Sequence, residues 1–138
     1  AGADVCARSA IGDEPMHHAA CNGHIECIHL LAELGASASC ATSKSLETPM
    51  HWAASNGLGE SVRALAALGA SVDARSSLGH TPLHNASISG HAECVSVLVE
   101  LGAALGPRRT TTSCDGYTPL DCAARLGHED CVRELVAG

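Results

Sequence analysis

Apolar residues between positions 79 and 103 fall into two short runs separated by turn residues. The first run follows Thr81-Pro82, where a hydroxyl can cap free backbone amides and proline suits the first helical position. Ser89-Gly90 breaks this run, and Gly102 ends the second one. The apolar positions of the second run have helical spacing and comprise Cys94, Val95, Leu98 and Leu101. The pattern predicts two short antiparallel helices joined by a turn.

The same pattern recurs along the chain. The helix-opening prolines lie 34, 33 and 37 residues apart, at Pro15, Pro49, Pro82 and Pro119. Self-similarity at this period indicates stacked units that cannot bury their apolar faces alone. We therefore predict a single domain over 1–138, with units at 8–40, 41–74 and 75–107 and an incomplete unit at 108–138. Residues 1–7 are interpreted as the tail of a preceding unit.

The recurring residues resemble a known signature. The segments TPMHWAA at 48–54, TPLHNA at 81–86 and TPLDCAA at 118–124 resemble the TPLHxA motif of ankyrin repeats. The resemblance implies an all-α repeat solenoid of stacked helix-turn-helix units joined by β-hairpin-like loops. Two residues depart from the pattern: Glu14 replaces the capping threonine, and Leu46 replaces the turn glycine. We expect the chain to be a monomer within a longer polypeptide.

Composition limits the classes of function. One Trp, one Tyr and no Phe occur among 138 residues, so the core must consist of small aliphatic side chains and cysteine. The net charge of −7 argues against nucleic acid or an anionic membrane as partner, since both bind clustered Lys and Arg. No apolar run is long enough to span a bilayer. We expect an intracellular protein, most simply a cytoplasmic one, that binds another protein or peptide.

The cysteines and histidines have structural interpretations. Cys27, Cys94 and Cys131 share one column of the repeat, with Ser61 in the second unit, and we expect buried free thiols there; a disulfide framework is the alternative. The repeated His17, His51 and His84 follow the capping position by three residues and are expected to stabilise the stack rather than to catalyse.

Two local patterns suggest further chemistry. The side chains of His17, His18, Cys21 and His24 could form a zinc site, which is the minor alternative of a metal-binding structural module. The segment Arg108-Arg109-Thr110-Thr111 could be phosphorylated, although a solvated loop is the simpler interpretation. No nucleophile elbow, phosphate loop or HExxH motif occurs, so we predict no cofactor and no enzyme activity.

The resemblance implies that a protein partner binds a concave face formed by the first helices and hairpins. Trp52 and Tyr117 are the only large aromatic residues and fall between the structural columns, where aromatic side chains favour binding. The predicted contact residues are His18, Asn22, Trp52, Ser55, Asn56, Leu78, His80, Asn85, Ile88, Ser89, Tyr117, Arg125 and Leu126. A wider set adds Asp13, Cys21, Lys44, Ser45, Glu47, Ser77, Asp115 and Cys122.

The leading hypothesis is a non-catalytic protein-interaction module or scaffold. The alternative is a regulatory or targeting domain of a larger enzyme such as a kinase or a ubiquitin ligase. Charge supports a difference between the two sides of the predicted solenoid, because acidic residues outnumber basic ones mainly in the helices. The back is therefore predicted to be acidic and the hairpin edge nearly neutral.

Overall fold

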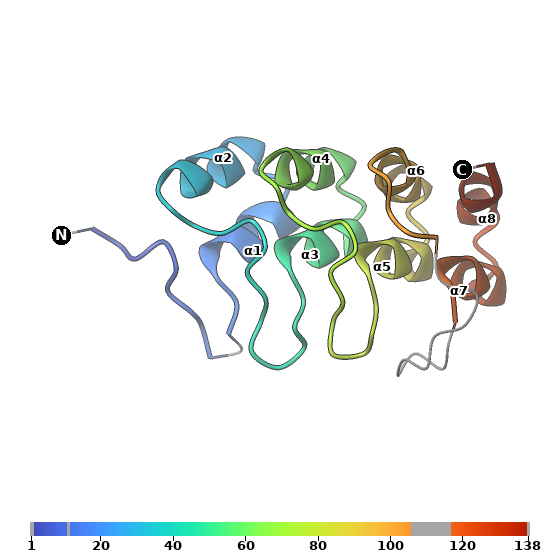
Figure 1. Ribbon diagram of the computed structural model, residues 1–138, viewed down its shortest axis with the longest axis horizontal. Helices are drawn as coiled ribbons and strands as arrows, with labels where there is room; N and C mark the ends of the chain where they lie inside the picture. Colours follow the sequence, from blue (N-terminus) through green and yellow to red (C-terminus); the bar gives the residue numbers. More distant parts are fainter. Residues whose placement is uncertain (1, 11, 106–116, 138) are drawn as a thin grey trace.

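The computed structural model describes residues 2–10, 12–105 and 117–137, and this part of the chain folds into eight helices without a strand. They form four helix pairs stacked in a row (Figure 1). The bounds are α1 Pro15–Cys21, α2 Ile25–Glu33, α3 Pro49–Ser55, α4 Gly59–Ala67, α5 Pro82–Ser89, α6 Ala92–Glu100, α7 Pro119–Leu126 and α8 Glu129–Ala137. The predicted all-α solenoid is confirmed.

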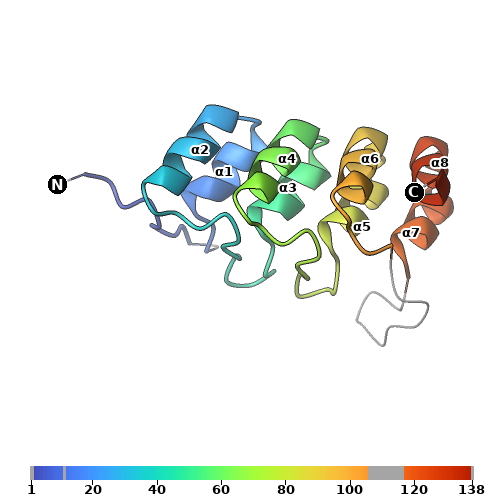
Figure 2. The same cartoon turned by 45° about the horizontal axis from the view of Figure 1, so that its top comes forward.

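The helices form two layers. The first helices of the pairs, α1, α3, α5 and α7, contact one another in sequence order, and so do the second helices α2, α4, α6 and α8 (Figures 1 and 2). Long connections precede α3 and α5 and project to the side of the first helices. Each unit therefore contacts the units before and after it, as expected for a solenoid.

The first helices begin at a repeated cap. The hydroxyl of Thr48 accepts a hydrogen bond from the amide of His51, and Thr81 and Thr118 act in the same way on α5 and α7. In return, the Thr48 amide donates to Nδ1 of His51 over 3.1 Å. At α1 the Glu14 amide donates to Nδ1 of His17, also over 3.1 Å, so the imidazole half of the cap persists without a threonine.

The core is thin and aliphatic. Its largest fully buried side chains are Met16, Met50 and Leu83 in the first helices and Ile28, Val62, Leu65, Val95 and Leu98 in the second helices. Alanines such as Ala53 and Ala86 fill the space between layers and allow the short helices to approach closely. This composition explains how a chain with so few aromatic residues buries a continuous core.

The cysteine column is buried only where a preceding repeat covers it. Cys94 and Cys131 are fully buried, and burial raises the pKa of the Cys94 thiol to about 12. Cys27, however, is exposed, so its predicted burial is wrong, because α2 has no neighbouring helix on that side among the described residues. Every cysteine in the described part of the chain is a free thiol.

Leu46 takes the backbone conformation of the glycine that it replaces. Its φ is 54°, close to the left-handed values of 83° at Gly12 and 78° at Gly79. A branched side chain is disfavoured in this region. The turn therefore keeps the geometry of its neighbours despite an unfavourable residue.

Ser61 occupies the cysteine column and carries a polar atom without a partner. Among the described residues its Oγ is the one buried side-chain oxygen or nitrogen that makes no hydrogen bond. We expect Ser61→Ala to raise the free energy of unfolding by about 1 kcal/mol, because the desolvation cost of the hydroxyl disappears. Urea denaturation monitored by circular dichroism measures the change.

Ser87→Ala is the matched control for this prediction. Ser87 is equally buried in a helix, but its hydroxyl donates to the carbonyl of Leu83 over 2.8 Å. This variant should gain no stability. Equal effects of the two substitutions would contradict the assignment of an unsatisfied hydroxyl at position 61.

Candidate functional site

The imidazoles that cap the first helices also join neighbouring repeats. Nε2 of His17 lies 2.9 Å from the carbonyl oxygen of Glu47, and Nε2 of His51 lies 2.8 Å from that of His80. His84 makes the third such contact, 2.9 Å from the carbonyl oxygen of Tyr117. Because Nδ1 accepts an amide hydrogen, the ring proton lies on Nε2, which donates to the carbonyl.

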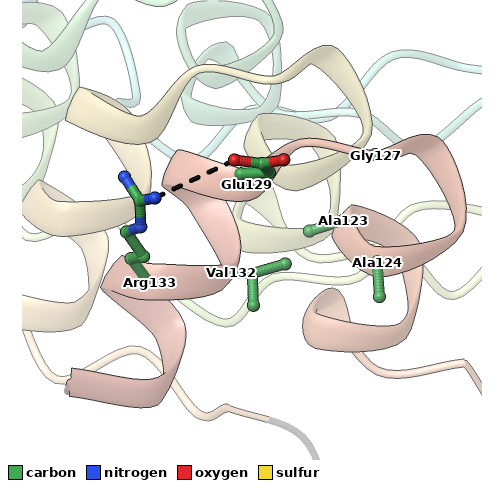
Figure 3. A pocket seen from close by; sticks show the side chains of 6 residues that line it. All are labelled: Ala123, Ala124, Gly127, Glu129, Val132 and Arg133. Carbon is green, nitrogen blue, oxygen red and sulfur yellow. Dashed lines mark ion pairs between the residues drawn. The ribbon is translucent and has the colours of Figure 1, made fainter.

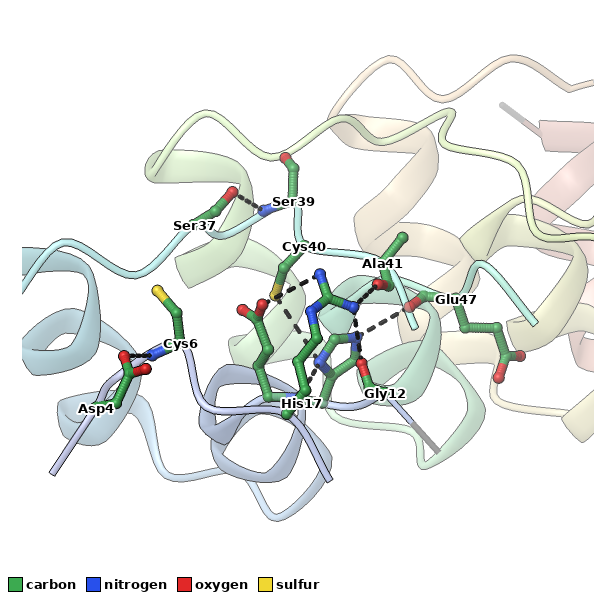
Figure 4. Close-up of polar contacts among 11 residues, drawn as sticks. Asp4, Cys6, Gly12, His17, Ser37, Ser39, Cys40, Ala41 and Glu47 are labelled. Atoms are coloured by element: carbon green, nitrogen blue, oxygen red, sulfur yellow. Dashed lines mark hydrogen bonds and ion pairs between the residues drawn. The ribbon is translucent and has the colours of Figure 1, made fainter. Parts of the chain in front are cut away.

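These imidazoles hold the hairpins against the first helices. Burial is the main cause that lowers the pKa of His17, His51 and His84, so all three are neutral donors at pH 7. Figure 4 shows His17 within this network, next to Cys40 and the carbonyl of Glu47. Their structural role, expected from the sequence, is confirmed by these contacts.

Trp52 lies half-buried at the surface between the first two repeats. Its ring centroid is 5.0 Å from that of His17 and 5.7 Å from that of His18, the latter in an edge-on arrangement. The two imidazoles fix the orientation of the indole while part of it stays accessible. His18 and Trp52, both predicted contact residues, are therefore brought together.

His18 is held by a buried carboxylate. Its Nε2 lies 2.6 Å from Oδ2 of Asp13, whose other oxygen accepts the hydroxyl of Ser9. The hydrogen bond from Ser9 is the main cause that lowers the pKa of Asp13, and burial opposes it. The serine hydroxyl points to the carboxylate instead of the imidazole, so His18 is not placed to act as its general base.

Polar side chains continue the surface along α3 and α5. The side-chain amide of Asn56 donates to the carbonyl oxygen of Cys21 over 2.9 Å, and that of Asn22, just after α1, donates to the carbonyl oxygen of His18 over 2.8 Å. Ser55 is half-buried and accepts a hydrogen bond from the Asn85 amide over 3.1 Å. Asn85 itself is only 8% exposed, so it supports the surface from beneath.

The remaining predicted contacts extend the surface to the last repeat. Leu78, Ser89 and Leu126 are exposed, whereas His80 and Ile88 are half-buried. The ring of His80 stacks on that of His84 at 5.5 Å. Tyr117 lies two repeats from Trp52, and the guanidinium carbon of Arg125 is 4.4 Å from its ring centroid. The two aromatic residues thus lie at separate places along the row of first helices, Trp52 on α3 and Tyr117 just before α7.

Arg8 is an unpredicted member of this region. Its guanidinium donates to the carbonyls of Gly12 and Ala41, each over 3.0 Å, and pairs with Glu14 at 3.2 Å. Arg75 makes the related contact to Gly79 at 3.5 Å. The signal was present in the sequence, because both arginines precede a turn glycine by four residues.

The four side chains of the suggested zinc site do not converge. His17 and His18 are engaged with different partners, and Cys21 receives the Asn56 amide. Within the described ranges no group of three or more His, Cys, Asp or Glu side chains is arranged to hold a metal ion. Asp115 and the segment 108–111 lie outside the described residues.

Comparison with known proteins assigns the chain to a family. A family model for ankyrin repeats (3 copies) matches residues 1–76 and 70–138, and the chain belongs to this family. Ankyrin repeats generally serve as protein–protein interaction modules and are typically non-catalytic. A search of the curated proteins finds no match to this chain. No helix in the described part of the chain combines the length and apolar character needed to cross a bilayer.

Proposed function

We propose that this chain is a non-catalytic interaction module that binds a protein or peptide along the row of first helices and their hairpins. The half-buried indole of Trp52, which stays partly accessible, carries the proposal. A large aromatic ring held in place before binding loses little conformational freedom when a partner packs on it. The contacts of Trp52 with His17 and His18 provide this preorganisation.

Tyr117 offers a second contact point on the same row. Tyr117 is 37% exposed, and the guanidinium of Arg125 on α7 lies over its ring. This contact holds the ring in a fixed position relative to α7. Leu126 at the end of α7 and Leu78 in the hairpin before α5 add exposed apolar area. A partner that spans from Trp52 to Tyr117 would therefore be an extended segment or a domain edge rather than a small molecule.

Charge favours a partner that is not a polyanion. The second helices carry exposed acidic side chains in every repeat: Glu26, Glu33, Glu60, Glu93, Glu100, Glu129 and Asp130. Arg63 neutralises only one of these carboxylates, because its guanidinium lies 2.7 Å from Glu100. We therefore propose that neither nucleic acid nor an anionic membrane is bound. The buried free thiols of Cys94 and Cys131 favour a reducing, intracellular setting.

A larger enzyme could use this surface to reach a substrate or a regulator, as the regulatory-domain hypothesis supposes. Such a role would place the enzyme chemistry elsewhere and leave the contacts of Trp52 unchanged. The surface and its test are therefore shared by both hypotheses.

The proposal is tested by capture from a native lysate with immobilised chain. We expect Trp52→Ala/Tyr117→Ala to lose the captured protein, because two anchors of the contact surface are removed. The control is Glu60→Ala/Glu93→Ala on the second helices α4 and α6, and this variant should capture the partner as the wild type does. Circular dichroism checks that the variants keep their helices. If the aromatic double variant is destabilised, Leu78→Ala provides an exposed alternative.

Unchanged capture by the folded aromatic variant would contradict the proposed surface. Loss of capture by the Glu60→Ala/Glu93→Ala control alone would indicate that the partner binds the second helices. Mass spectrometry of the captured material would then identify the partner.

A further inference from the structure

Neighbouring repeats meet at a repeated joint between a histidine and a glycine. The ring of His91 lies against Gly57, where an added Cβ would come within 2.7 Å of Nδ1. The ring of His128 lies against Gly90 in the same way, at 2.8 Å, and its Nε2 is 3.0 Å from the carbonyl oxygen of Ile88. At these two junctions the histidine before the second helix thus fills a space that only glycine leaves open, whereas at the first junction Leu58 lies 3.6 Å from a Cβ added at Gly23.

Both halves of this joint are left unmatched at the ends of the stack. His24 precedes α2, is exposed, and lines an apolar hollow of about 350 Å³ formed by α1 and α2. Gly127 ends α7, has no atom within 4 Å of an added Cβ, and lines a hollow of about 310 Å³ (Figure 3). One end therefore carries the ring without a slot, and the other end carries the slot without a ring.

Apolar residues that are buried between repeats inside the stack are exposed at each end of it. On α2, Leu30 is 54% exposed, whereas its counterparts Ala64 and Val97 are 7% and 4% exposed beneath the preceding repeat. On α7, Leu120 is 37% exposed, whereas its counterpart Leu83 is 0% exposed beneath the following repeat. We call the α1–α2 side, with Leu30 and His24, the leading face, and the α7–α8 side, with Leu120 and Gly127, the trailing face.

We propose that the leading face of one copy of this chain binds the trailing face of a second copy, head to tail. The argument is the continuity of this contact with the joints inside the chain, where faces of the same two kinds already pack together at three successive positions. Apolar side chains that are accessible in a single copy would be removed from water in the pair. This inference does not rest on the proposed function, although two of the predicted contact residues, His18 and Asn22, also line the leading hollow.

The two faces differ, so the pairing is heterologous. A copy that binds through its leading face keeps a free trailing face, and association is open-ended. The leading hollow carries no Asp, Glu, Lys or Arg, and the charged pair Glu129 and Arg133 beside the trailing hollow is internally matched at 3.8 Å. The interface therefore buries no unpaired charge from either lining. This self-association differs from the monomer expected from the sequence.

Sedimentation velocity of the whole chain under reducing conditions tests the proposal, with reductant present because Cys27 is exposed on the leading face. The wild-type chain should show a mass that rises with concentration above the monomer value of 14.0 kDa. Leu30→Glu and Ala124→Glu place a carboxylate in the leading and trailing hollows, respectively. Each should weaken association by at least about tenfold. Leu46→Glu makes the same charge change on an exposed turn residue outside both faces and should associate as wild type.

Mixing the two blocked variants gives the decisive result. Together they retain one intact leading face and one intact trailing face, so the mixture should form a dimer with one copy of each and nothing larger. If Ala124→Glu fails to fold, the 37%-exposed Leu120 provides Leu120→Glu as the trailing-face variant.

Three results would overturn the proposal. A wild-type chain that stays monomeric at the highest soluble concentration would show that the end faces do not bind one another. Association of the trailing-face variant by itself would indicate pairing between two leading faces. Association that neither variant weakens would place the contact elsewhere.

Discussion

Lowering the pH from about 7.5 to about 5.5 should lower the free energy of unfolding by up to about 4 kcal/mol. The cause is the set of three neutral histidines that join the repeats. His17, His51 and His84 are buried, and their pKa values are lowered mainly by that burial. Protonation of Nδ1 would also break the hydrogen bond from the backbone amide at each helix start.

The sign of the effect follows from which state binds the protons. Above about pH 6.5 the imidazoles are neutral in both the folded and the unfolded chain, and their contribution is fully present. Below that value the unfolded chain takes up protons that the folded chain excludes, so stability falls as the pH falls. Over this range each histidine lowers the free energy of unfolding by up to about 1.4 kcal/mol for every unit of pH decrease, until the pH reaches its lowered folded-state pKa.

Urea denaturation at a series of pH values measures this slope. The variant His51→Gln should be less sensitive to acid, because one titrating group is lost from the joints between repeats. The control is His29→Gln, at an exposed position on α2, and its pH dependence should match that of the wild type. A flat profile between about pH 7.5 and 5.5 would contradict the assignment of neutral, buried imidazoles.

Replacing His51 with alanine should cost about 3 kcal/mol of stability. The side chain is fully buried and joins the Thr48 amide to the carbonyl of His80 in the next repeat. Its removal leaves a cavity and two polar backbone groups without these partners. The loss would be a large part of the total stability of a domain of this size.

Two substitutions calibrate the effect of His51→Ala. His29→Ala removes an exposed imidazole from α2 and should cost less than about 0.5 kcal/mol. Asp121→Ala removes the equivalent capping residue of α7, whose carboxylate accepts the Thr118 amide over 2.9 Å but bonds to no following repeat in the described chain. It should cost about 1 kcal/mol. Equal losses for all three variants in thermal or urea denaturation would show that the imidazole does not join the repeats.

Periodic features of the fold could be predicted from the sequence because each is encoded locally. Thr48 and Pro49 mark a helix start whatever lies beside them, and the three-residue spacing to His51 places the imidazole at the cap. The repeat position of a residue does not show whether a helix of the preceding repeat packs over its side chain. Cys27 was therefore wrongly expected to be buried. Burial at such a position depends on whether another repeat lies next to it, and the residue type at the position does not show this.

Contacts within the candidate surface were less predictable for a related reason. The stacking distances between repeats decide that the ring of Trp52 lies against His17 and His18, and the sequence period contains no such distances. The burial of Asn85 follows from its bond to Ser55 in the preceding repeat. The left-handed conformation of Leu46 shows that the turn between repeats is set by the stack, against the preference of the residue.

The most direct measurement of the binding surface uses the single tryptophan of the chain. With Trp52 replaced biosynthetically by fluorotryptophan, the chain gives one fluorine resonance, which reports on the indole alone. The proposal predicts that a protein captured by the wild-type chain shifts or broadens this resonance in proportion to the fraction bound. A resonance that stays unchanged when binding is saturated would place the partner away from Trp52 and contradict the proposed surface.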